Sequence, residues 1–170
     1  RRKNKKTRTI RTNSFNFFLC LYFSFYSIST VADSKITPSD VYQKTEELRL
    51  KLIDLNILDM QMYESVEADN ALRHPRHVMQ KVRKCHQVFE KILKDRDIQI
   101  DPLPRMHSER EIRPSDVLGG VNHLIKEISK IQSKASTPKT EYVSGKLPSD
   151  VFNNLKKICR AAHVEITPPD

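Results

Sequence analysis

Four prolines divide the chain into units of similar length, and a valine follows each proline three residues later. The four pairs are Pro38/Val41, Pro75/Val78, Pro114/Val117 and Pro148/Val151. Three units begin with Pro-Ser-Asp-Val, and the second begins with Pro75-Arg76-His77-Val78. Repetition at a spacing of a few tens of residues constrains architecture first, because each unit must form one element that packs on its neighbours.

Apolar residues recur in each unit at the steps of three and four residues that mark one face of a helix. The positions seven, ten and fourteen after the prolines hold Thr45, Val82, Val121 and Leu155, then Leu48, Cys85, Leu124 and Ile158, then Leu52, Phe89, Ile128 and Ala162. We expect helices over residues 38–62, 75–97, 114–134 and 148–164. The sequence therefore predicts an all-α protein, a four-helix bundle or compact helical array of four amphipathic helices initiated by Pro-(Ser-Asp)-Val elements.

The Pro-Ser-Asp element has the composition of a helix start. With Thr37 as the N-cap, Pro38 takes the first helical position, and Asp40 reaches back to the cap. Arg113 and Leu147 are poor caps, so in the third and fourth units Ser115 or Ser149 is the alternative N-cap. In either register the motif predicts structure, and we expect no catalytic serine.

The connectors between the expected helices are long. Residues 98–113 and 135–147 exceed the usual helix-hairpin loop of about 2 to 8 residues. A connector of that length allows the next helix to run parallel to the previous one. The sequence leaves the order and direction of the helices open.

The first 32 residues have the order of a secretory signal peptide. Seven Lys and Arg residues within positions 1–11 precede an apolar stretch at 15–28, and small residues follow at Thr30 and Ala32. We expect cleavage after Ala32. Residues 33–170 then form a single helical domain in the periplasm or outside the cell. An uncleaved N-terminal anchor is the alternative, although the apolar stretch is shorter than the ~20 residues that span a bilayer.

The basic residues of this leader account for most of the formal net charge of +9. The rest of the chain is nearly balanced, and its basic residues alternate with acids. Nucleic-acid binders concentrate basic residues to displace counterions from phosphates. We therefore predict no nucleic-acid partner, and membrane contact only through an uncleaved leader.

Two pairs of side chains have spacings that suit a metal ion. Cys159 and His163 lie four residues apart on one expected helix, and His74 and His77 lie three apart at the start of another. The pairs share no visible third ligand, so we expect no cofactor. Cys85 and Cys159 are the two cysteines after the leader, and an oxidising compartment could join them; a pair of free buried thiols is the alternative.

Motifs for catalysis are missing from the sequence. Three glycines cannot build a phosphate-binding loop, and neither a nucleophile elbow nor a His-Glu-x-x-His motif occurs. We predict a protein that is not an enzyme and that acts by contact with a partner protein or with itself. The alternative is a periplasmic sensor or carrier that holds a small ligand or metal between its helices, for which we expect a cavity lined by Tyr42, Phe89, Leu118 or Phe152.

Overall fold

The computed structural model describes residues 35–106, 111–132 and 139–162, which all belong to one compact unit beginning at Lys35. These residues form helices and no strands, which confirms the all-α prediction. The helices are α1 Pro38–Asp54, α2 Met60–Ser65, α3 Pro75–Lys94, α4 Pro114–Ile128 and α5 Pro148–Ala161. Within these ranges, no helix has the length and apolar content needed to cross a bilayer. The expected leader, residues 1–32, lies outside the described residues.

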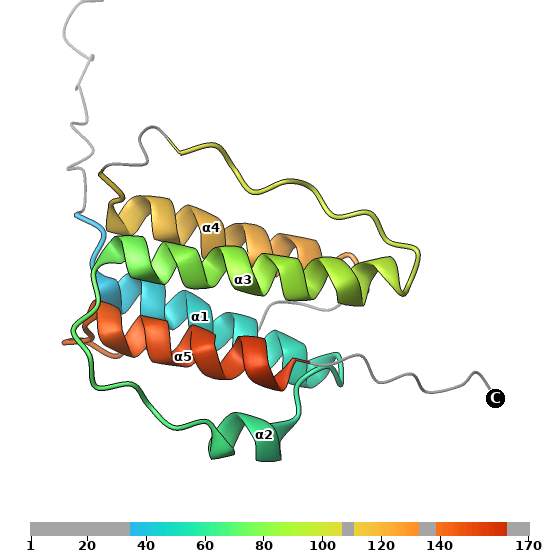
Figure 1. Cartoon of the computed structure of the whole chain (residues 1–170), viewed down its shortest axis with the longest axis horizontal. Helices are drawn as coiled ribbons and strands as arrows, with labels where there is room; N and C mark the ends of the chain where they lie inside the picture. The colour runs from blue at the N-terminus through green and yellow to red at the C-terminus, as the bar shows by residue number, and fades with distance from the viewer. Residues whose placement is uncertain (1–34, 107–110, 133–138, 163–170) are drawn as a thin grey trace, which may run out of the picture. The chain divides into compact units, whose positions relative to one another are not determined.

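The four long helices run in the same direction and begin at one end of the unit (Figure 1). Their starting prolines and valines together line one small apolar hollow at that end. Helix α1 packs on α4 and α5, helix α3 packs on the same two, and α2 packs on α5. The repeated Pro…Val element therefore places equivalent residues of the four units at the same level.

Each connector returns along a helix, which is what lets the next long helix start at the same end. The connector after α1 passes α5 in the reverse direction, since Asp59 bonds to Ala161 and Asp69 bonds to Asn153 further back. The connector after α3 runs back along α3 and α4 as far as it is described (Figure 1). The connector before α5 lies along α1, where Lys146 N–H donates to Ser39.

Burial confirms the predicted core register. The valines three residues after the prolines are buried, and so are all the residues at positions seven, ten and fourteen. The single polar member of this set is Thr45, whose hydroxyl donates to the Tyr42 carbonyl at 2.7 Å and accepts from Asn154. The core is thus built in successive levels to which each long helix contributes one residue.

The helix starts follow one of the two predicted registers. Thr37 caps α1, and its hydroxyl and its N–H each donate to the Asp40 carboxylate at 2.7 Å, bonds that lower the pKa of this carboxyl group. The alternative caps Ser115 and Ser149 are wrong, because the prolines before them occupy the first helical position. There the aspartate at the third helical position accepts the N–H of Arg113 or Leu147 instead, so no serine cap is needed.

The helix ends are less well predicted. The first expected helix, 38–62, is wrong beyond Asp54, because Asn56 adopts a left-handed φ of 53° and Ile57 N–H turns back to the Leu52 carbonyl. Helix α3 ends in the same way, with Asp97 at φ 56°. Helix α4 stops at Ile128, before the expected end at 134. Residues 163 and 164 of the last expected helix lie outside the described part of the chain.

Candidate functional site

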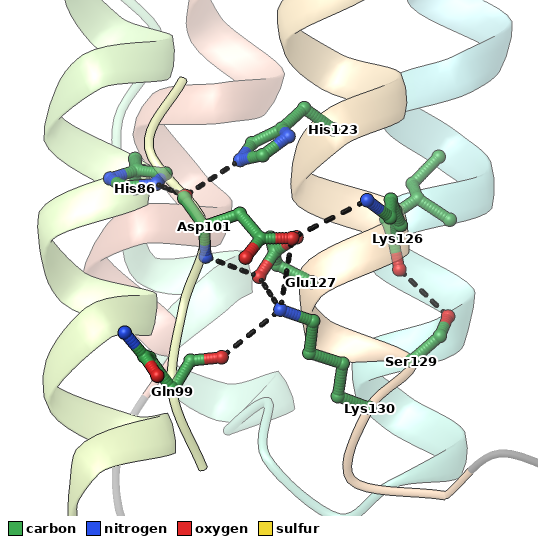
Figure 2. A network of polar contacts seen from close by, with 9 residues as sticks. His86, Gln99, Asp101, His123, Lys126, Glu127, Ser129 and Lys130 are labelled. Carbon is green, nitrogen blue, oxygen red and sulfur yellow. Dashed lines mark hydrogen bonds and ion pairs between the residues drawn. The ribbon is translucent and has the colours of Figure 1, made fainter. Parts of the chain in front are cut away.

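A polar network fastens the connector after α3 to the sides of α3 and α4 (Figure 2). The Asp101 carbonyl oxygen accepts from Nε2 of His86 and from Nε2 of His123, each at 3.0 Å. The two imidazole rings stack with their centroids 5.6 Å apart. Because a carbonyl oxygen only accepts, both histidines carry a hydrogen on Nε2 in this arrangement.

Glu127 is the buried anion of this network, with none of its surface exposed. Its Oε2 atom accepts the Asp101 N–H at 2.9 Å and lies 2.5 Å from the Lys130 ammonium group. Lys130 also donates to the Gln99 carbonyl at 3.0 Å. Hydrogen bonds from Lys130 and then Lys126 lower the pKa of Asp101, and the bond to Glu127 raises the pKa of Lys130.

The network binds protein groups to one another. One oxygen of Glu127, Oε1, has no hydrogen-bond partner among the described residues, and the other oxygen is held by Asp101 and Lys130. No group of three or more His, Cys, Asp or Glu side chains within the described ranges is arranged to hold a metal ion. The network therefore holds the connector against α3 and α4.

Three of the four candidate metal ligands, His74, His77 and Cys159, lie within the described residues. His74 is the N-cap of α3, and its N–H donates to Nδ1 of His77 at 3.0 Å, so that His77 uses one ring nitrogen to start the helix. Cys159 is joined to Cys85 in a disulfide, which removes its thiolate as a ligand. His163, its expected companion, lies outside the described residues.

The disulfide links α3 to α5 across a Cα–Cα distance of 5.1 Å. Cys85 fills its predicted core position, and Cys159 is half-buried at the surface of the same contact. Of the two states that the sequence allowed, free thiols or a bond, the structure has the bond. The crosslink fixes the spacing between the residues that precede and follow it on both helices.

Five cations gather along the contact between α3 and α5, and we call them the basic seam. They are Arg73, Lys81, Lys84, Lys156 and Arg160. Burial lowers the pKa of Lys81, and the positive charges of the other four lower it further. The Phe152 ring holds two of the cations, with Arg73 Cζ 4.3 Å and Lys81 Nζ 5.1 Å from the ring centre.

Sequence reasoning missed the basic seam. Its residues come from two units and from the connector before α3, and only the parallel packing of α3 on α5 brings them together. One available signal was the composition of residues 75–94, where six Lys and Arg residues accompany a single acid. That excess contradicts the expected alternation of basic residues with acids, and the near balance of charge over residues 33–170 conceals it.

The residues expected to line a ligand cavity do not surround a common space. Phe89 is completely buried in the core, whereas Leu118 and Phe152 are half-buried. Tyr42 lies beside Tyr63, Asn154 and Lys146 in a hollow of about 170 Å³ that opens to solvent. Comparison of the chain with protein families, with curated proteins and with solved structures gave no match.

Proposed function

We propose that this chain is an exported, non-catalytic helical protein that works by contact with another protein or with a second copy of itself. In this proposal, residues 1–32 are a removable leader. The remainder is a four-helix bundle of four repeated units, each a Pro-initiated helix with a returning connector. The observation that carries the proposal is the filled core between the helices.

The filled core supports a contact role because the hollow between the four helix starts is too small for a ligand. Among the described residues, the apolar hollow at the proline end measures about 20 Å³ and is lined by the four prolines and the four valines. A water molecule needs about 10 to 15 Å³ of such volume, and ligand pockets reach about 300 to 1,000 Å³. The surface is therefore the part of the molecule that is available for binding.

The disulfide between Cys85 and Cys159 supports export. Disulfides persist in the periplasm and outside the cell, and cytosolic reductants keep most thiols reduced. A crosslink between two buried or half-buried cysteines agrees with a leader that directs the chain to an oxidising compartment. The periplasm or the extracellular medium is the proposed location.

A native mass spectrum of the protein, made with its N-terminal segment and recovered from a bacterial periplasm, tests this function. We expect a chain that begins at Asp33, is two hydrogens lighter than its reduced form, and carries no small-molecule adduct. A retained metal, haem or lipid mass would overturn the contact role in favour of a carrier. A chain that keeps residues 1–32 would overturn the removable leader.

A further inference from the structure

An acidic segment adjoins the basic seam in the same molecule. Residues 54–69 contain five acids and no Lys or Arg, and they lead from the end of α1 through α2. The acids are Asp54, Asp59, Glu64, Glu67 and Asp69. All except Asp69 belong to exposed residues. We call this stretch the acidic segment.

The two surfaces meet at one edge within a single chain. The Asp69 carboxylate bonds to Arg73, and the Glu67 carbonyl oxygen accepts from Lys156 at 2.9 Å. Glu67 contributes its backbone there, and Asp54, Asp59 and Glu64 lie earlier in the segment. Helix α2 packs on α5, and α3 packs on α5 as well, so α5 borders the acidic segment and carries part of the basic seam.

The basic seam presents several positive charges close together. Arg73 and Lys81 both lie over the Phe152 ring, and Lys84 and Arg160 are exposed next to the joined Cys85 and Cys159. The disulfide fixes the distance between α3 and α5, so the cations of one helix cannot move away from those of the other to reduce their repulsion. Like charges held close together favour a complementary surface of opposite sign.

We infer that the basic seam binds the acidic segment of a second copy of this chain, so that two copies form a reciprocal, twofold pair. This inference rests on the contact function proposed above and names its partner. A twofold axis between adjoining surfaces of opposite sign places each against its complement on the other copy. Charge complementarity between two surfaces of one sequence selects the occupant.

An extended polyanion fits this face less well. The phosphates of a nucleic acid or the headgroups of an anionic membrane spread negative charge over a wide area. Such a surface would meet the acidic segment as soon as it touched the seam. A compact acidic segment of about 16 residues, as the chain itself supplies, meets the five cations without that repulsion.

Sedimentation velocity of the full chain, at several concentrations and at low and high salt, tests the inference. We expect a dimer at low salt that dissociates as salt is raised, because exposed charges are screened within about 10 Å at 0.1 M and 3 Å at 1 M. A dimer indifferent to salt would overturn the inference.

Two charge-reversal variants make the test specific. Lys84→Glu with Arg160→Glu reverses the charge at the two exposed cations of the basic seam, and Glu64→Lys with Glu67→Lys reverses the charge at two exposed acids of the acidic segment. Each variant alone should raise the dissociation constant at least about tenfold, since each replaces attractive pairs by repulsive ones. An equimolar mixture should restore the dimer, because the reversed seam of one variant then meets the reversed segment of the other, and the unaltered seam meets the unaltered segment. Failure of the mixture to associate, with both variants folded by circular dichroism, would overturn the pairing.

Lys91→Glu with Lys94→Glu is the matched control. It changes the net charge of the chain as much as the seam variant does, at exposed positions in the last turns of α3. The control should dimerise like the parent chain, and equal weakening would show that net charge alone acts. A parent chain that is monomeric at every concentration overturns self-association. It leaves the contact function standing, which an adduct in the native mass spectrum would overturn instead.

Discussion

Gly119 and Gly120 are adjacent in α4, yet their surroundings are opposite. A Cβ atom added at Gly119 meets no other atom within 4 Å, whereas one added at Gly120 would lie 2.9 Å from Cγ1 of the buried Val82. Of these two positions, Gly120 is therefore the one at which α4 packs closely against α3. Gly119 is an exposed helix residue with no packing reason to be glycine.

Substitution of each glycine by alanine should separate the two roles. Gly119→Ala should raise the free energy of unfolding by up to about 1 kcal/mol, because alanine favours the helix. Gly120→Ala should lower it by about 1 to 2 kcal/mol, because overpacking against Val82 exceeds that gain. Urea denaturation of both variants measures the difference. A stabilised Gly120→Ala protein would contradict the close packing of α3 and α4.

Tyr63 makes the stability of the protein depend on pH in the alkaline range. Its hydroxyl donates to Asn154 Oδ1 at 2.7 Å, and burial, followed by the charge of Glu46, raises its pKa from 10.0 to about 12. The folded state therefore favours the protonated phenol. This contribution is complete below pH 10 and is lost as the pH rises toward 12.

Tyr63→Phe should remove this dependence. We expect a loss of about 1 kcal/mol at neutral pH from the missing hydrogen bond, and a shallower fall in stability between pH 10 and pH 12 than the parent shows. Denaturation at a series of pH values measures both effects. Tyr142→Phe, at an exposed tyrosine, is the control and should match the parent. An unchanged alkaline slope in Tyr63→Phe would show that the phenol titrates without linkage to folding.

At the scale of elements, the connector after α3 depends on Glu127. Glu127→Leu removes the acceptor of the Asp101 N–H, and Glu127→Gln keeps an acceptor without the charge that Lys130 meets. Hydrogen bonds to charged groups contribute about 1.5 to 3 kcal/mol. We expect the Asp101 amide to exchange about 10 to 100 times faster in Glu127→Leu, with Glu127→Gln in between. Hydrogen exchange followed by NMR measures this rate, and unchanged protection in the leucine variant would contradict the role of Glu127 in holding the connector.

The starts and inner faces of the helices could be predicted from the sequence, and their ends could not. A proline at the first helical position and the three-and-four spacing of Val41, Thr45, Leu48 and Leu52 are local signals. The end of α1 depends on Asn56, which adopts a left-handed conformation without being glycine. Asparagine does so only in some contexts, and the apolar residues after it continue a helical spacing that the chain does not use.

The same limit applies to the basic seam. Cys85 and Cys159 could be proposed as a pair because the part of the chain after the leader has no other cysteine. The gathering of Lys81 and Arg160 could not be proposed, because it requires that α3 and α5 be parallel neighbours. Connector length allowed that direction without selecting it, and the choice depends on contacts between residues far apart in the sequence.

For the whole molecule, the disulfide is the strongest single restraint on the unfolded chain. It joins residues with a sequence separation of 74. A loop of that size implies about 4 kcal/mol in the chain-entropy model, and measured effects are commonly about 2 to 4 kcal/mol. Reduction should lower the free energy of unfolding by about 2 to 4 kcal/mol. Urea denaturation with and without a reductant measures it, and a double variant Cys85→Ala, Cys159→Ala should not respond. Equal stability with and without the bond would contradict this restraint.

The common direction of the long helices has a consequence for how the chain folds. Of the four contacts between long helices, only the one between α3 and α4 joins neighbours in sequence; the others join α1 to α4, α1 to α5 and α3 to α5. A parallel pair cannot form as a helical hairpin, because the connector must first travel the length of a helix. Most stabilising contacts then require the closure of long loops before any gain is made. Although it is all-α, this chain should therefore fold at a rate closer to that of mixed α/β domains than to that of up-and-down bundles.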